Sequence, residues 1–359
     1  MAENSLSTKN LGNYPEDFSL VGRDYKKVSD LRYGTNPSQT AALYNSNSFL
    51  GSLRELRTGK QGLSQTNVED IFWAALITGY FDKPSAIIMK HENPCGFATQ
   101  HESESLCEIY EKAADSDFRA AFGGVVLINR QIDLKTAGSI KKTFTEVVVA
   151  PDYGDGVVEK LSRGTTRILK YDEKRFAAIP RFIGDKNEPE IKKLPDGSVI
   201  ISDTLLTPIF SEQNLEKYAV SKRKPTENEF RDLLIGYRIR LRSNSVRMIK
   251  NGHTVALGTG QQDRIGCIEI AAFRNKRLEE LAEEAGRQRV ANYSIENSVL
   301  VSDGFFPFTD SIELAKKLGV TAVLASHGGK NFEQILEKAN ELKIGFIDLP
   351  GEMRFFDHH

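Results

Sequence analysis

An adjacent lysine and histidine, Lys90 and His91, follow the apolar run from Ala86 to Met89. Such a run predicts a buried strand, and in α/β proteins ligands often lie at the carboxyl end of a strand. Lysine and histidine are also readily tuned to exchange protons near neutral pH. The next residues, Asn93-Pro94 and Cys95-Gly96, predict that the strand breaks there. The simpler interpretation is a surface lysine beside a capping histidine.

Eight further strings accompany the pair in one order along the chain. They are Arg32–Gln39, Leu63–Asn67, Ala121–Gly124, Glu146–Pro151, Ser243–Ser245, Gly258–Arg264, Ser302–Phe308 and Arg354–His359. Together they resemble the AICAR transformylase domain of the bifunctional enzyme of purine biosynthesis, which also carries IMP cyclohydrolase. The resemblance extends from about Leu31 to the last residue.

The resemblance implies an AICAR transformylase, which moves the formyl group of 10-formyltetrahydrofolate to the 5-amino group of AICAR and gives FAICAR for IMP synthesis. That amine is a poor nucleophile because its lone pair delocalises into the ring and the carboxamide. Attack therefore needs a base, a donor to the developing oxyanion and an acid for the leaving folate nitrogen. The expected catalytic residues are His91 as base, Lys90 on the formyl side and Asn244 holding the carboxamide. The sequence leaves open which of Lys90 and His91 is base and which is acid.

The resemblance also assigns binding residues. Arginine suits phosphate, glycine admits close backbone approach, and a carboxylate can accept hydrogen bonds from ribose hydroxyls. The residues expected to bind AICAR are Arg32, Tyr33, Asn67, Gly123, Glu146, Arg264, Phe305, Arg354, Phe356 and His358. On the folate side, where an aromatic run offers an apolar surface, we expect Gln261, Pro307, Phe308 and Asp310. Ser38 stands where the family usually has histidine, and its effect is left open.

Composition narrows the class of partner and the compartment. The 359 residues carry a formal net charge of -1, which argues against nucleic-acid and membrane-surface partners. The chain has no apolar run long enough to span a bilayer and no signal-peptide pattern at its N-terminus. Its three cysteines, Cys95, Cys107 and Cys267, are widely spaced, which fits a reducing compartment. We expect a cytoplasmic protein with small-molecule ligands.

The resemblance implies two cytidine-deaminase-like subdomains, and related deaminases bind a catalytic zinc ion. Zinc deaminases combine His-x-Glu with Pro-Cys-x-x-Cys. Here Pro94-Cys95 has Ala98 in place of the second cysteine, and the string from His101 to Glu104 lacks a thiolate pair. We therefore predict no catalytic metal.

Helix and strand patterns alternate, which predicts an α/β fold in two units of similar size and suggests a duplicated fold without a residue-level repeat. A capping box from Thr226 to Glu229 starts the second unit. The expected helices are 68–77, 106–114, 230–238, 268–273, 278–291, 312–318 and 332–342. The expected strands are 86–89, 125–128, 147–149, 246–249, 254–257, 298–302, 322–325 and 345–349. Residues 151–220 predict a helix and an irregular crossover arm.

The expected division is a tail or strap over 1–30, a first cytidine-deaminase-like subdomain with the crossover arm over 31–224, and a second such subdomain over 225–359. Only about 30 residues precede the transformylase-like part, so we expect a stand-alone module, with a separate IMP cyclohydrolase as a candidate partner. Family members build their sites across a two-fold interface, which implies a homodimer in which Arg32 and Tyr33 serve the partner's pocket. Two alternatives stay open: cyclisation of FAICAR to IMP, and nucleotide binding without catalysis.

Overall fold

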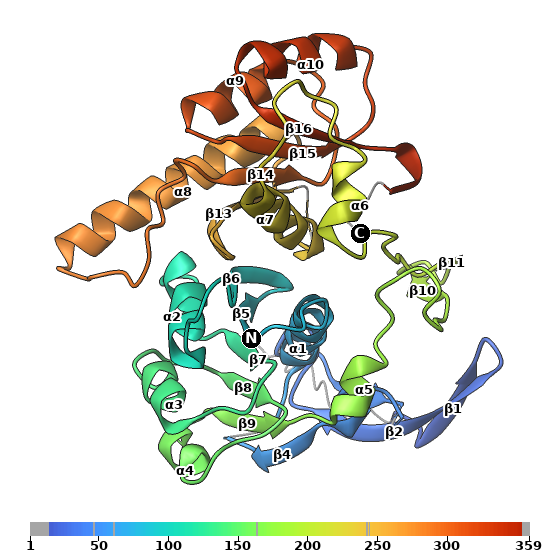
Figure 1. Cartoon of the computed structure of the whole chain (residues 1–359). Coiled ribbons are helices and arrows are strands. Elements are labelled where there is room, and N and C mark those ends of the chain that lie inside the picture. The colour runs from blue at the N-terminus through green and yellow to red at the C-terminus, as the bar shows by residue number, and fades with distance from the viewer. Residues whose placement is uncertain are drawn as a thin grey trace, which may run out of the picture. The chain divides into compact units, whose positions relative to one another are not determined.

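A computed structural model describes residues 14–45, 47–59, 62–162, 164–241, 243 and 245–353. The chain divides after Ala178 into two units, and each is built from a sheet with helices on it (Figure 1). This confirms the α/β class. The expected division at residue 225 had assigned the crossover arm to the first unit, whereas the arm from Ile179 onward lies in the second. In the described part of the chain, no helix has the length and apolar character to cross a membrane.

The main sheet of the first unit has the strand order β6-β5-β7-β8-β9-β4. Its strands are β4 (Arg54–Arg57), β5 (Ser85–Lys90), β6 (Asn93–Thr99), β7 (Val125–Ile128), β8 (Val147–Ala150) and β9 (Arg167–Lys170). β5 is antiparallel to β6 and β7, whereas β7, β8 and β9 are parallel. The continuous β-branched runs of β7 and β8 thus lie in a parallel region, as predicted.

Helices cover both faces of this sheet (Figure 1). α1 (Gln65–Thr78) packs against β5 and β7 on one face. On the other face, α2 (Leu106–Ser116), α3 (Leu134–Ile140) and α4 (Val157–Leu161) share a hydrophobic core with the strands. The short α5 (Glu173–Ala177) ends the unit. Capping boxes start α1 at Ser64 and α2 at Ser105. Both helices were predicted from their pattern of apolar residues, and α1 begins three residues before the predicted start.

The second unit repeats this arrangement with the order β13-β12-β14-β15-β16. Its strands are β12 (Ser245–Lys250), β13 (His253–Thr259), β14 (Val299–Ser302), β15 (Ala322–Ser326) and β16 (Gly345–Leu349). β12 is antiparallel to β13 and β14, and β14, β15 and β16 are parallel, as in β6-β5-β7-β8-β9. α7 (Glu227–Arg238) packs on β12 and β14, and a separate core joins the strands to α8 (Arg264–Glu284), α9 (Asp310–Lys317) and α10 (Phe332–Glu341). The predicted duplication is present in the strand order.

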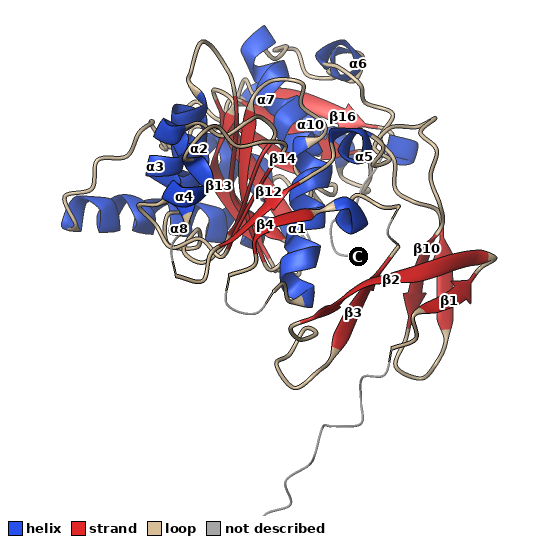
Figure 2. Cartoon of the chain, turned by 90° about the horizontal axis from the view of Figure 1, so that it is seen from below, coloured by secondary structure: helices blue, strands red, loops and turns tan. Residues whose placement is uncertain are grey.

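Two small antiparallel sheets and two short 3-10 helices complete the described elements. β1 (Asp17–Leu20), β2 (Arg23–Leu31) and β3 (Ala41–Tyr44) form a sheet of their own in the region that includes the expected tail or strap (Figure 2). β10 (Glu190–Lys193) and β11 (Val199–Ser202) form a hairpin in the crossover arm, followed by α6 (Glu212–Glu216). The 3-10 helices are η2 (Leu50–Ser52) and η3 (Gly351–Met353).

Three local predictions were wrong. The strand does not break at Asn93–Gly96, because these residues continue as β6. A Cβ at Gly96 would lie 2.0 Å from the Ala113 carbonyl oxygen, so glycine permits close packing of α2 rather than a turn. The helices expected at 268–273 and 278–291 are one helix, α8, which ends at Glu284. The third error is β9, a buried strand inside the stretch expected to hold a helix and an irregular arm.

Candidate functional site

Lys90 and His91 lie at the tip of the β5–β6 hairpin. Lys90 pairs with Asn93, so His91 and Glu92 form the two-residue turn. Both turn residues have positive φ, 55° and 60°. A hairpin turn of this kind suits Asn-Gly, and positive φ is uncommon in other residues, more so for glutamate than for histidine. The chain therefore has an uncommon backbone conformation at the predicted catalytic histidine and the residue after it.

The carboxylate of Asp70, on α1, holds this turn. It accepts hydrogen bonds from the backbone N–H groups of His91 at 3.2 Å and Glu92 at 2.6 Å. Trp73, one turn further along α1, donates its indole N–H to the Glu92 carboxylate at 3.1 Å. Burial raises the pKa of Asp70 to about 6, although the two backbone hydrogen bonds oppose this shift. α1 thus fixes the turn from two of its side chains.

The second unit has the same device with a different turn. Asp232 on α7 accepts hydrogen bonds from the backbone N–H groups of Asn251 at 2.8 Å and Gly252 at 2.9 Å. Asp232 follows its helix N-cap, Thr226, at the same spacing as Asp70 follows Ser64. Asn-Gly adopts positive φ at little cost. One scaffold thus carries an unstrained turn in one unit and a strained His-Glu turn in the other, and such strain tends to accompany function.

Lys90 lies beside the predicted Gly123. The Lys90 ammonium donates a hydrogen bond to the carbonyl oxygen of Phe122 at 2.8 Å. Gly123 has φ 75°, and a Cβ there would lie 3.9 Å from Lys90 Nζ. The Phe122 ring is mostly exposed and lies 5.4 Å from that of Phe144, measured between centroids. The end of β5 and the loop before β7 therefore meet at this point.

Glu146, directly before β8, joins the same group through α1. Asn67 donates its side-chain amide to Glu146 Oε2 at 3.0 Å, and the Glu146 N–H donates to Gly124 at 3.1 Å. Asn67, Asp70 and Trp73 follow one another at intervals of three, so they lie on one face of α1. That face positions both Glu146 and the His91 turn.

Arg32 and Tyr33 follow β2 and lie against the start of α1. The Arg32 N–H donates to the Leu63 carbonyl at 2.8 Å, and the Tyr33 carbonyl accepts from Gln65 at 3.0 Å. Arg32 Nη2 donates to the Tyr33 hydroxyl at 2.9 Å, and its guanidinium lies 4.5 Å from the ring centroid. The structure thus gathers seven predicted residues around α1 and one edge of the sheet: Arg32, Tyr33, Asn67, Lys90, His91, Gly123 and Glu146. Arg32 and Tyr33 therefore lie beside candidate site residues of their own chain, whereas the resemblance implied that they serve the partner's pocket.

The position of these residues on the sheet differs from the usual position of ligand sites in α/β proteins. Ligands usually lie at the carboxyl ends of parallel strands. Lys90 does end β5, but β5 runs antiparallel to β7. Lys90 therefore meets the amino ends of β7 and β8, where Gly124 and Glu146 precede the strands.

In the second unit the predicted residues lie near the carboxyl ends of the parallel strands, whereas in the first unit they lie near the amino ends. Arg264 begins α8, and its Nε lies 2.9 Å from Asp303 Oδ1, directly after β14. A Cβ at Gly304 would lie 2.5 Å from Arg264 Nη2, so glycine is needed there. Ser243 accepts a hydrogen bond from the Gly260 N–H at 3.1 Å, which ties the segment before β12 to the loop that contains Gln261.

The aromatic run after β14 divides between core and surface. Phe306 is buried in the hydrophobic core, whereas Phe308 is 60% exposed. Phe305 is half-buried, and Pro307 is exposed. Asp310 begins α9, and its carboxylate accepts a hydrogen bond from the Ser311 N–H at 2.6 Å. Three of the four residues of this run therefore leave apolar surface available to a ligand.

The loop after β15 lies against this run and was not assigned to the site from the sequence. A Cβ at Gly329 would lie 3.1 Å from the Phe305 ring, and Asn331 donates to the Pro307 carbonyl at 2.8 Å. In the same loop, His327 Nδ1 lies 2.6 Å from Asp348 Oδ2.

Comparison with known proteins identifies the family. The model of the AICARFT/IMPCHase bienzyme family matches residues 2–274. The chain belongs to this family. The bifunctional purine biosynthesis protein PurH of Persephonella marina is 33% identical to it, over 96% of the chain and 62% of that protein. The PurH proteins of Anoxybacillus flavithermus and Clostridium perfringens are 32% and 33% identical, each over 93% of the chain and over 60% and 59% of their own lengths. The chain therefore spans about 60% of the length of these relatives.

Four predicted residues that the family resemblance assigned lie outside the described residues: Asn244, Arg354, Phe356 and His358. Two others that contact the site were missed, Asp70 and Trp73. The signal for Asp70 was the repeat itself, since Asp232 occupies the same place after the capping box of α7. Trp73 carried no signal of its own.

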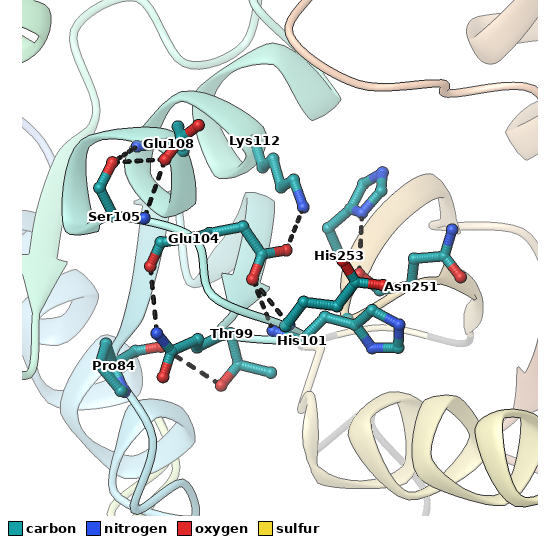
Figure 3. Close-up of polar contacts among 12 residues, drawn as sticks. Pro84, Thr99, His101, Glu104, Ser105, Glu108, Lys112, Asn251 and His253 are labelled. Atoms are coloured by element: carbon teal, nitrogen blue, oxygen red, sulfur yellow. Dashed lines mark hydrogen bonds and ion pairs between the residues drawn. The ribbon is translucent and has the colours of Figure 1, made fainter.

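The partial zinc pattern around His101 serves local structure (Figure 3). The Glu104 carboxylate lies 2.5 Å from Lys112 Nζ and accepts hydrogen bonds from the N–H groups of His101 at 3.2 Å and Glu102 at 2.8 Å. Among the described residues, no group of three or more His, Cys, Asp or Glu side chains could hold a metal ion. That the family's reaction needs no metal here stays a prediction.

This Glu104–Lys112 pair predicts a pH-dependent stability. Burial alone would raise the pKa of Glu104, but the bonds from Lys112 and Glu102 lower it to about 2. The stabilisation is therefore complete above the ordinary value of 4.5 and is lost as the pH falls toward 2. Glu104→Gln is expected to lower the free energy of unfolding by roughly 2 kcal/mol at pH 7, and by less than half of that at pH 3. Urea unfolding at both pH values tests this, with exposed Glu102→Gln as control, and an equal loss at both would contradict it.

Proposed function

We propose that this protein transfers a formyl group from 10-formyltetrahydrofolate to the 5-amino group of AICAR, giving FAICAR for IMP synthesis. The family carries this activity beside a cyclohydrolase, as its description states. The observation that supports the transformylase most is the strained His91–Glu92 turn, fixed by Asp70. Uncommon backbone conformations tend to occur at functional sites, which supports a role for the His91 imidazole in the reaction.

The proposed mechanism assigns one step to each side chain. His91 removes a proton from the amine as the amine nitrogen attacks the formyl carbon. The Lys90 ammonium has three N–H donors, and one of them bonds to the Phe122 carbonyl oxygen. The others can donate to the formyl oxygen and polarise it. The carbon–nitrogen bond to the folate then breaks, and the leaving nitrogen takes up a proton to give tetrahydrofolate. Asn244 is proposed to hold the carboxamide.

The proposed binding residues follow the chemistry of the two substrates. Asn67 and Glu146 suit the ribose hydroxyls, Arg32 and Tyr33 suit the phosphate, and Gly123 admits close approach of the base. We also assign to AICAR Arg264, Phe305, Arg354, Phe356 and His358, and to the folate Gln261, Pro307, Phe308 and Asp310. The exposed ring of Phe308 supports an apolar surface for the folate.

The finer fold and the cellular setting belong to the same proposal. We propose that both units are cytidine-deaminase-like, and their shared strand order supports this. All three cysteines are free and buried, which fits a cytoplasmic enzyme. A separate IMP cyclohydrolase is proposed to act on the FAICAR.

A homodimer with shared active sites is also proposed, and the β10–β11 hairpin supports it. Val199, Ile200 and Ile201 on β11 are 53%, 49% and 56% exposed. Neighbouring side chains of a strand point to opposite faces, so both faces of this two-stranded sheet need cover. Sedimentation at micromolar concentration is expected to show a dimer that Ile200→Asp weakens, while Lys135→Asp, at an exposed position on α3 outside the hairpin, does not. A monomeric wild type would contradict the proposal.

Purified protein with AICAR and 10-formyltetrahydrofolate tests the function. Formation of FAICAR and tetrahydrofolate is the expected result. FAICAR supplied alone and converted to IMP would favour the cyclohydrolase, and binding of AICAR without turnover would favour a regulator. Free formate in place of the folate checks the formyl donor. Absence of FAICAR with either donor would overturn the proposal.

A further inference from the structure

Arg167 is a buried arginine that none of these roles uses. It is the first residue of β9 and only 2% exposed. Its backbone N–H donates to the Glu146 carbonyl at 2.9 Å, and its Nε donates to the Gly62 carbonyl. Its Nη2 is buried and has no hydrogen-bond partner among the described residues. Buried polar groups in proteins nearly always have hydrogen-bond partners, so this nitrogen is a candidate to bind an acceptor from outside the described residues.

A second arginine, Arg32, is bonded to the segment that Arg167 contacts. Its N–H donates to Leu63, next to the Gly62 that Arg167 contacts. The Nε of Arg32 is likewise buried without a hydrogen-bond partner in the described part of the chain. Burial and the charge of Arg32 lower the pKa of Arg167, whereas Glu146 opposes this shift. Two like charges thus lie close together, and each carries a buried donor without a hydrogen-bond partner among the described residues.

A bound oxyanion would accept hydrogen bonds from both buried donors and would neutralise the two positive charges. A phosphate monoester offers three oxygens and a double negative charge, and guanidinium groups bind it in a forked geometry. Glu146 adjoins the pair, because Arg167 donates to its backbone carbonyl. Donors for a phosphate and an acceptor for hydroxyl groups therefore lie side by side, which matches a ribose 5-phosphate better than an isolated carboxylate.

We propose that Arg167 and Arg32 together bind the phosphate of a ribose monophosphate, and that Arg167 makes the site prefer a ribotide to the corresponding riboside. The identity of the full ligand, AICAR, rests on the proposed function. The phosphate site itself does not depend on formyl transfer.

The test compares a ribotide with its riboside in the full chain. Calorimetric titration of Arg167→Met is expected to show AICAR binding weakened roughly 10- to 50-fold, the size of a charge-assisted hydrogen-bonded contact, and riboside binding changed less than about twofold. Arg167→Lys should recover part of the affinity, because it restores the charge without the fork. Arg130→Met is the control, since both terminal nitrogens of Arg130 already donate to backbone carbonyls.

The titrations with Arg167→Met have outcomes that would overturn the phosphate site. Equal losses for ribotide and riboside, or unchanged AICAR binding in folded Arg167→Met, would overturn the proposal. If Arg167→Met fails to fold, Arg167→Lys and Arg32→Met carry the same comparison. If the wild type does not bind AICAR, the proposed function fails, and thermal stabilisation by ribose 5-phosphate then tests the anion site. Stabilisation that Arg167→Lys reduces would sustain the site, and none by ribose 5-phosphate or inorganic phosphate would refute it.

Discussion

Replacement of His91 by alanine is expected to lower kcat for formyl transfer at least about 100-fold, the low end of what a general base contributes. The imidazole is the side chain proposed to take the amine proton, and it stands on a turn fixed by Asp70. Steady-state kinetics with AICAR and 10-formyltetrahydrofolate measure the effect. His101→Ala is the matched control, because the proposed mechanism gives His101 no role, and its kcat should stay within about twofold of the wild type.

A glycine at the same position separates chemistry from backbone strain. His91→Gly removes the imidazole but adopts φ 55° without steric cost. It should therefore match His91→Ala in activity while unfolding at a higher denaturant concentration than His91→Ala. Added imidazole should restore part of the rate to both variants. Full activity in either one would remove His91 from the mechanism.

Replacement of Asp70 by alanine is expected to lower kcat by roughly 30- to 100-fold, because a misplacement of about 1 Å in a catalytic group can cost that much. The substitution leaves the N–H groups of His91 and Glu92 without their acceptor. The strained turn should then relax, so that the imidazole leaves its position while its chemistry is intact. The KM for AICAR should change little, since Asp70 touches neither substrate in the proposal.

The duplicated fold provides the control for this prediction. Asp232→Ala removes the same pair of backbone contacts from the Asn251–Gly252 turn of the second unit. It should lower stability as Asp70→Ala does and leave kcat within about twofold, because that turn carries no proposed catalytic residue. If both variants lost activity equally, the effect of Asp70 would be general destabilisation rather than positioning.

Most elements were predictable because their signals are local. The capping box from Thr226 to Glu229 marked the start of α7, and continuous β-branched runs marked β7 and β8. The errors arose where a distant contact overrides local preference. Asn275 does not end α8, because its amide donates to the carbonyls of Val255 and Tyr293 from inside the helix.

The α/β class could be predicted from the hydrophobic runs, and the candidate site residues, Lys90 and His91 among them, from short motifs that resemble the family, because both signals lie within a few positions of one another. The residues that hold the candidate site in place from other parts of the chain could not be predicted. Asp70 reaches a turn 21 residues away in sequence, and Arg167 contacts Gly62, in the segment before α1, across 105 residues of sequence. Such contacts depend on how strands and helices pack: the backbone N–H groups of His91 and Glu92 find their acceptor, the buried carboxylate of Asp70, on a helix that precedes them in sequence.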